Sequence, residues 1–178
     1  MEFEREKQSL LLEGVRYTAN DLHLLKTKAV GASDSSTGQM LYDFLQEWFT
    51  ESPWMTVHTS GSTGKPKKIR ISKDKMMQSA RLTCEFLNLQ IGDTALLCMN
   101  LRYIGAMMVV VRSLVAGLNL IIRPASGHPL ADMKQPLRFA AMVPLQVYNT
   151  LQVPEEKERL RQTDVLIIGG GAIDEALE

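Results

Sequence analysis

Residues 94–122 read TALLCMNLRYIGAMMVVVRSLVAGLNLII and carry the clearest structural pattern in the chain. Two short apolar segments, Thr94–Met99 and Asn119–Ile122, flank the longer and nearly all-apolar segment Tyr103–Ala116. The short segments have the length of buried strands, and the long one has the length of a helix. Because strands that alternate with helices usually run parallel, we predict a parallel sheet covered by helices on both faces.

The same alternation continues on both sides of this stretch. Towards the C-terminus we expect strands at Phe139–Val143 and Val165–Ile168, with a helix at Pro144–Gln152 between them. Towards the N-terminus the pattern predicts a helix, two strands and a capped helix, at Leu41–Thr50, Met55–His58, Ile69–Ile71 and Ser72 to about Leu87. The predicted fold class is therefore α/β, with a mostly parallel sheet and helices on both faces over residues 41–178.

Residues 1–40 are expected to form an N-terminal arm. Residues 8–17 predict a strand, a turn and a second strand, because two apolar runs flank a Glu-Gly dipeptide. Thr18 stands three residues before Asp21, which is typical of the start of a helix. Residues 31–38, GASDSSTG, predict a polar loop that closes the arm.

The composition excludes several classes of protein. The 178 residues are enough for one self-supporting core. Lys and Arg together number 20, as do Asp and Glu, so the formal net charge is zero and nothing global attracts nucleic acid or an anionic membrane. The longest apolar run, Ile104–Val111, has eight residues, far below the roughly 18 that a membrane span needs. We expect a cytoplasmic protein with no nucleic-acid or membrane partner.

The residue types that usually bind metals are scattered. Cys84 and Cys98 have no CxxC partner, so neither a zinc site nor a disulfide framework is indicated. His128 lies in a Ser-Gly-His-Pro turn, where a metal-binding or catalytic role is not expected. Residues 155–161 alternate acids and bases and predict a solvated helical face. We predict no metal site in this chain.

The segment Thr59–Lys67, TSGSTGKPK, is the strongest functional signal. It consists mainly of glycine, hydroxyl side chains and lysine, which suit a polyphosphate. Pro66 stands five residues beyond Gly61, where a Walker A loop requires its second glycine, so the spacing excludes that motif. Six basic residues and one acid between Lys65 and Lys75 concentrate positive charge beside the segment. The alternative is a polar hairpin loop with solvated lysines.

This segment closely resembles the phosphate-binding signature of the adenylate-forming superfamily, which includes acyl-coenzyme A synthetases, peptide-synthetase adenylation domains and luciferases. The resemblance implies that ATP and Mg²⁺ activate a carboxylic acid as an acyl-adenylate, and that coenzyme A then displaces AMP to give a thioester. It also implies the roles of the segment's residues. Lys67 would neutralise phosphate charge during catalysis, and the ATP phosphates would be held by Thr59, Ser60, Gly61, Ser62, Thr63, Gly64 and Lys67.

Two later segments resemble o-succinylbenzoate:coenzyme A ligases of menaquinone biosynthesis. They are Ala140–Val147, AAMVPLQV, and Val165–Ile173, VLIIGGGAI. By this resemblance the glycine turn, Gly169, Gly170 and Gly171, would approach the adenine and the acyl group, for which missing side chains leave room.

The chain also departs from the family pattern. The family's Pro-x-Phe-His segment aligns with residues 100–103, which contain no histidine. Tyr103 is a candidate for the aromatic position beside the acyl pocket, and Arg102 is a candidate partner for a substrate carboxylate. The alternative is that both are surface residues at the start of a helix.

The glycine turn is followed by only about two turns of predicted helix. We therefore expect an N-terminal piece of a longer ligase, without the family's C-terminal domain, that does not catalyse ligation alone. Two alternatives stay open. One is a non-catalytic nucleotide-binding module or partner subunit, and the other is a structural domain with an incidental polar loop. The sequence predicts no oligomeric state.

Overall fold

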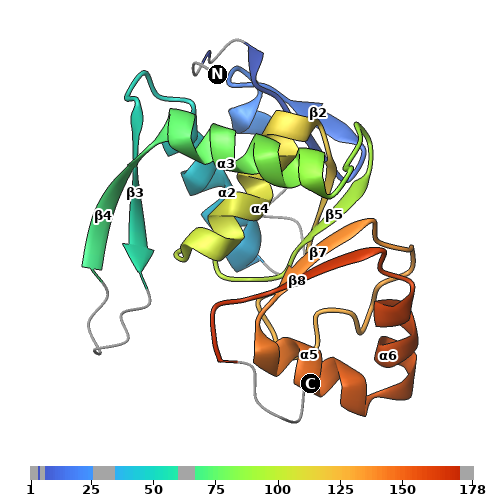
Figure 1. Ribbon diagram of the computed structural model, residues 1–178. Coiled ribbons are helices and arrows are strands. Elements are labelled where there is room, and N and C mark those ends of the chain that lie inside the picture. Colours follow the sequence, from blue (N-terminus) through green and yellow to red (C-terminus); the bar gives the residue numbers. More distant parts are fainter. Residues whose placement is uncertain (1–3, 5–6, 26–34, 60–66, 173–178) are drawn as a thin grey trace.

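The computed structural model describes residues 4, 7–25, 35–59 and 67–172, and a six-stranded sheet forms its centre (Figure 1). The strand order is β2-β1-β6-β5-β7-β8. Neighbours pair in parallel except for β1 and β2, which form an antiparallel hairpin. The strands are β1 (Leu10–Leu12), β2 (Val15–Tyr17), β5 (Thr94–Leu97), β6 (Asn119–Ile122), β7 (Phe139–Met142) and β8 (Val165–Ile168). The predicted mostly parallel sheet is confirmed.

Helices cover both faces of this sheet, as the alternating pattern predicts. One face packs against α2 (Ser35–Trp48), α3 (Lys73–Phe86) and α4 (Ile104–Ala116), and the other faces α5 (Pro144–Gln152) and α6 (Pro154–Arg161) (Figure 1). Alternate residues of β5 divide between the two cores: Leu97 packs on the α4 side and Leu96 on the α5 side. This division follows from the two-residue period of a strand.

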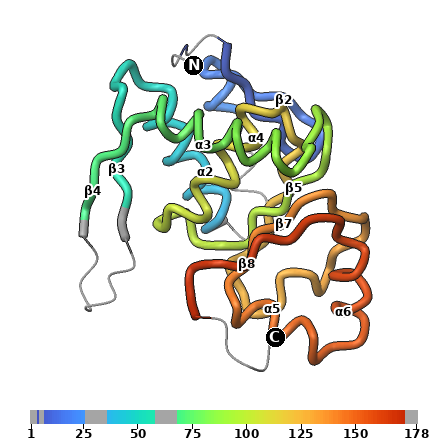
Figure 2. The backbone as a smooth tube through the Cα atoms, viewed as in Figure 1, coloured from blue at the N-terminus to red at the C-terminus, as the bar shows by residue number. Residues whose placement is uncertain are grey.

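The remaining strands form a separate antiparallel hairpin beside the main sheet (Figure 2). They are β3 (Trp54–Thr59) and β4 (Lys67–Ser72), paired in register from Trp54 opposite Ser72 to Thr59 opposite Lys67. The strands expected here are therefore confirmed. At the base of the hairpin, Ser72 caps α3 by accepting a hydrogen bond from the backbone N–H of Lys75.

The polar loop expected at residues 31–38 is wrong for residues 35–38, which form the first turn of α2. Thr37 is 3% exposed and Gly38 is also buried. They continue the buried face that includes Leu41, so packing outweighs the weak helix propensity of Ser, Thr and Gly. Residues 31–34 lie outside the described part of the chain.

Within residues 4, 7–25, 35–59 and 67–172, no helix combines the length and the apolar character needed to cross a lipid bilayer.

Candidate functional site

The connections of the sheet reverse direction between β5 and β7. From β5 the chain runs through α4 to β6 on one side, whereas from β7 it runs through α5 and α6 to β8 on the other. The strands β5 and β7 are parallel neighbours, so a crevice opens beyond their carboxyl ends. In α/β sheets such a reversal point is the usual place for a ligand.

A cavity of about 700 Å³, which we call the strand-end cavity, lies at this point. The residues that follow β5, β7 and β8 line it, including Asn100, Val143 and Gly169. The first turns of α4 and α5 line it as well, through Gly105 and Gln146 among others. Because the N-terminus of a helix carries partial positive charge and free N–H groups, two such ends favour an anionic group here.

The glycine turn after β8 forms one edge of the strand-end cavity. Gly169 and Gly170 line it, whereas Gly171 is absent from the lining. Gly170 has φ +82°, a conformation that strains any residue with a Cβ. A Cβ on Gly171 would lie 3.4 Å from Cδ of Pro144. The turn therefore passes close to the start of α5 and leaves backbone next to the cavity.

Arg112 is the single charged side chain among the described residues that line the strand-end cavity. It lies two turns along α4 from Gly105, and its guanidinium carbon is 5.8 Å from the ring centre of Phe139. Its Nε is buried without a hydrogen-bond partner among the described residues. Burial lowers the pKa of Arg112 from its ordinary value, and the nearby Cys84 opposes that shift. The side chain stays charged, so its position is electrostatically costly without an anion.

Sequence reasoning missed Arg112. The signal was present, because Arg112 is the one charged residue in the apolar helix Ile104–Ala116. Its spacing from Gly105 and Met108 places all three on one helical face, towards the cavity.

The two candidate substrate residues separate in the structure. Tyr103 lines the strand-end cavity and is 47% exposed. Arg102 is exposed and is absent from the lining, and its backbone N–H donates to Oδ1 of Asn100 at 2.9 Å. Arg102 therefore fits the alternative of a surface residue at a helix start.

Thr59 and Lys67, the two ends of the predicted phosphate loop, form the last described pair of the β3–β4 hairpin. The predictions for Ser60, Gly61, Ser62, Thr63 and Gly64 fall outside the described residues.

A metal site finds no support in the described part of the chain, where no three His, Cys, Asp or Glu side chains gather. Cys98 also lines the strand-end cavity, and burial raises the pKa of its thiol to about 12, so the thiol is neutral at pH 7.

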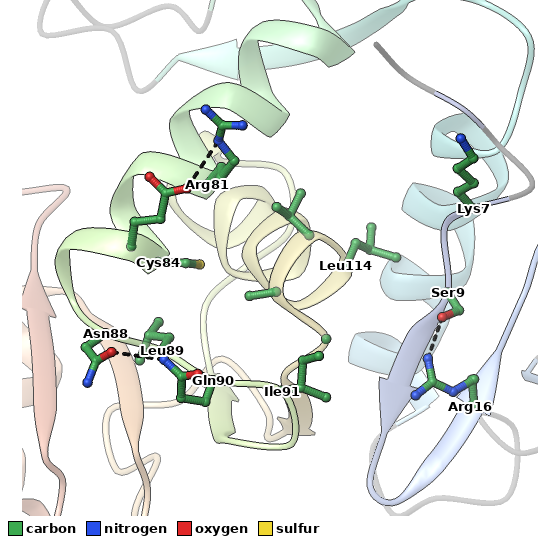
Figure 3. Close-up of a pocket in the computed structure, with 14 residues that line it drawn as sticks. Lys7, Ser9, Arg16, Arg81, Cys84, Asn88, Leu89, Gln90, Ile91 and Leu114 are labelled. Atoms are coloured by element: carbon green, nitrogen blue, oxygen red, sulfur yellow. Dashed lines mark hydrogen bonds and ion pairs between the residues drawn. The ribbon is translucent and has the colours of Figure 1, made fainter. Parts of the chain in front are cut away.

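A second cavity, of about 600 Å³, lies where α3 and α4 end, and we call it the helix-end cavity (Figure 3). Three cations line it, and each has a partner. Lys7 pairs with Glu4, Arg81 with Glu85, and Arg16 donates to Oγ of Ser9 at 2.7 Å.

Comparisons with known proteins agree with this architecture. A family model described as AMP-binding enzyme matches residues 11–178. Two 2-succinylbenzoate–CoA ligases, from Bacillus mycoides (strain KBAB4) and Bacillus cereus (strain Q1), are each 30% identical over 82 residues. These residues are 46% of this chain and 17% of each relative, so the matched part is a small share of the curated proteins.

Solved structures of similar proteins confirm the predicted fold. An acyl-CoA synthetase (AMP-forming)/AMP-acid ligase II-like protein from Dyadobacter fermentans superposes with a TM-score of 0.73 at 30% identity, over 85% of this chain and 44% of that one. The o-succinylbenzoate coenzyme A synthetase from Bacillus subtilis, in complex with AMP, has a TM-score of 0.55 at 20% identity, over 68% of this chain and 26% of that one.

Proposed function

Since the chain belongs to the AMP-binding enzyme family, we propose that it is the N-terminal part of an acid:coenzyme A ligase that acts on o-succinylbenzoate. In this reaction the acid carboxylate attacks the α-phosphorus of ATP, which releases pyrophosphate and forms an acyl-adenylate. Coenzyme A then displaces AMP to form the thioester. The observation that carries the proposal is the strand-end cavity with Arg112, whose buried Nε has no hydrogen-bond partner among the described residues.

The lining of this cavity fits an aromatic acid with two carboxylates. Most of the lining is apolar, and Met108, Ala141 and Ile167 offer contacts to a ring. The guanidinium of Arg112 supplies the partner for one carboxylate, held away from the reacting end. The helix N-termini favour the second carboxylate, where adenylation takes place. This arrangement supports the same substrate class that the Bacillus relatives carry in their names.

ATP would bind between this cavity and the β3–β4 hairpin in the proposal. The phosphates are assigned to Thr59–Gly64 with Lys67, and the adenine to the glycine turn Gly169–Gly171. The described residues offer no carboxylate cluster for Mg²⁺, so we assign no Mg²⁺ ligand in this chain.

The nucleotide assignment is tested by Lys67→Ala, with Lys75→Ala as the control in the same basic segment. Lys75 is exposed in the first turn of α3. ATP affinity, measured by calorimetry, is expected to fall roughly tenfold in the first variant, because a charged hydrogen bond contributes about 1.5–3 kcal/mol. Equal affinities in both variants would remove Lys67 from the phosphate site.

The acid assignment is tested by amide NMR during titration with o-succinylbenzoate. Gly105, Gly127 and Gly170 line the strand-end cavity, whereas Gly117 lines the helix-end cavity. The first three resonances are expected to shift in a saturable way while Gly117 stays unchanged. Shifts confined to Gly117, or none at all, contradict the proposal. ATP binding without acid binding would favour a non-catalytic nucleotide-binding module.

This chain spans 17% of the curated relatives and 44% of the Dyadobacter protein, so the activity of the whole ligase extends beyond what these residues supply. We propose that the 178 residues bind acid and nucleotide without completing ligation. Pyrophosphate release that depends on o-succinylbenzoate, above background, would contradict this.

A further inference from the structure

Gln146 holds together three segments at the mouth of the strand-end cavity. Its side chain is buried, with 5% exposed, in the first turn of α5. The Nε2 group donates to the carbonyl of Cys98 and to the carbonyl of Ser126, each at 2.8 Å. Its Oε1 accepts a hydrogen bond from the backbone N–H of Val143 at 3.1 Å. One amide therefore makes three bonds to backbone.

These bonds join the ends of three strands. Cys98 directly follows β5, Val143 directly follows β7, and Ser126 belongs to the segment that leaves β6. Residues 124–127, which we call the wall segment, contain neither helix nor strand. Ala125, Ser126 and Gly127 form part of the cavity lining, so the donation from Gln146 to Ser126 connects this wall to the sheet.

Neighbouring contacts limit where the wall segment can lie. A Cβ on Gly127 would come within 2.6 Å of Nδ2 of Asn149 on α5, so the backbone approaches this helix closely. Beyond the wall segment, Nδ1 of His128 lies 2.9 Å from Oε1 of Glu156, and Arg159 donates to the carbonyls of Leu130 and Ala131. The chain is thus anchored on α6 after the wall segment and on Gln146 within it.

The prediction of a solvated helical face at residues 155–161 is wrong for Glu156 alone, because Glu155, Lys157, Glu158 and Arg161 are exposed. Glu156 is 4% exposed because His128 and the chain around Leu130 cover that side of α6. The face therefore supports the loop that follows β6, which sequence periodicity alone does not reveal.

We propose that Gln146 is a positioning residue that fixes the wall segment and thereby shapes the cavity for its acid. This proposal rests on the proposed function in one respect, namely that the strand-end cavity binds the acid. Without the Gln146 amide, the carbonyls of Cys98 and Ser126 lose their donor, and water satisfies them only if the wall segment moves outward.

Cys98 reports such movement. Its thiol is fully buried, with Sγ 3.6 Å from the carbonyl of Ala141 and 3.9 Å from Oε1 of Gln146. Cys84 provides an internal reference, because it is buried between α3 and α4 on the opposite face of the sheet. Local opening of the wall segment exposes Cys98 alone, whereas global unfolding exposes both thiols.

The experiment measures iodoacetamide labelling of each cysteine by peptide mass spectrometry in the whole chain. Gln146→Met preserves the length of the side chain and removes its three hydrogen bonds to backbone, together with the contact from the Cys98 thiol to Oε1. Gln152→Met is the control, because Gln152 is exposed on the same helix. We expect Cys98 labelling to accelerate about tenfold in Gln146→Met, with Cys84 labelling unchanged, and no change in the control. If Gln146→Met fails to fold, Gln146→Asn gives the same comparison with a shorter amide.

Titration of the same proteins with o-succinylbenzoate separates the two proposals. Selective Cys98 labelling together with about tenfold weaker acid binding in Gln146→Met supports the positioning role. Unchanged Cys98 labelling, equal acceleration at both cysteines, or acid binding that is insensitive to Gln146→Met each overturns it. If the unmodified chain binds no acid but Cys98 is selectively exposed in Gln146→Met, Gln146 still positions the wall and the proposed function fails.

Discussion

The strand-end cavity and the helix-end cavity have similar volumes, about 700 and 600 Å³. They differ in whether the cationic side chains that line them have partners. Lys7, Arg16 and Arg81 in the helix-end cavity each have a partner, and Figure 3 shows the contacts of Arg16 and Arg81. Arg112 in the strand-end cavity has no ion pair or hydrogen bond to any described residue. A cation that is already satisfied gains little from a ligand, whereas a buried and unpartnered one gains much.

Lys73 adds a third case, because it is a fully buried cation whose partners belong to the protein. Its Nζ donates to the carbonyl of Thr50 at 2.8 Å. Burial alone therefore does not mark a binding site. Arg112 differs in two respects: its Nε has no hydrogen-bond partner in the described part of the chain, and its side chain lines a cavity.

The largest expected effect is that of Arg112→Met on acid binding. Affinity for o-succinylbenzoate should fall at least about tenfold, because one carboxylate loses a charged partner. The free energy of unfolding should stay equal or rise, since an unpaired charge no longer has to be buried. Calorimetry and urea denaturation measure the two quantities. Arg81→Met in the helix-end cavity should change neither binding nor its salt dependence.

A smaller effect is expected for Lys73→Met, which leaves the carbonyl of Thr50 without its charged donor. We expect a loss of about 1–2 kcal/mol in the free energy of unfolding at pH 7. Burial lowers the pKa of Lys73 from 10.5 to about 8, so between pH 8 and 10.5 the unfolded chain binds a proton that the folded chain does not. The free energy of unfolding of the unmodified chain should therefore rise with pH across this window. In Lys73→Met this rise should be absent. Denaturation at several pH values tests this, and parallel profiles would contradict it.

Alanine substitutions of one glycine in each cavity should cause similar backbone strain but affect ligand binding differently. Gly170 has φ +82° and Gly117 has φ +68°, so alanine at either position should cost about 1 kcal/mol of stability. Only Gly170→Ala should also weaken acid or nucleotide binding. Thermal denaturation and ligand titration of both variants provide the check, and equal losses of binding would mean that the strand-end cavity is not the site.

The smallest effect is expected for Arg16→Gln. The guanidinium of Arg16 bonds to Ser9 at an exposed position, so its loss should change the free energy of unfolding by less than about 0.5 kcal/mol. Acid binding should be unchanged. A marked loss of acid affinity in this variant would remove the distinction between the two cavities.

The sequence predicts the centre of this fold well because its signals are local. Within residues 94–122, the lengths and apolar content of the segments fit a strand, a covering helix and a second parallel strand, as the structure has them. The predicted glycine turn after β8 contributes Gly169 and Gly170 to the lining of the strand-end cavity, and Gly170 adopts a conformation that suits glycine. Its role beside the adenine and the acyl group stays a prediction.

Features that depend on distant contacts were missed or misplaced. The early start of α2 depends on the burial of Thr37, and the burial of Glu156 depends on a loop 28 residues earlier. The role of Arg112 is a tertiary property too, because a lone arginine in an apolar helix does not reveal whether a partner faces it. Arg102 is a candidate because residues 100–103 align with the family's Pro-x-Phe-His segment, and the structure leaves this residue exposed at the helix start.

The most direct test of the central claim compares two acids on two proteins by calorimetry. The acids are o-succinylbenzoate and 4-oxo-4-phenylbutanoate, which lacks the carboxylate on the ring, and the proteins are the unmodified chain and Arg112→Met. We predict that the unmodified chain prefers the dicarboxylate at least about tenfold and that Arg112→Met binds both acids with similar, weaker affinity. An equal preference for the dicarboxylate in both proteins would contradict the assignment of Arg112 and of the strand-end cavity.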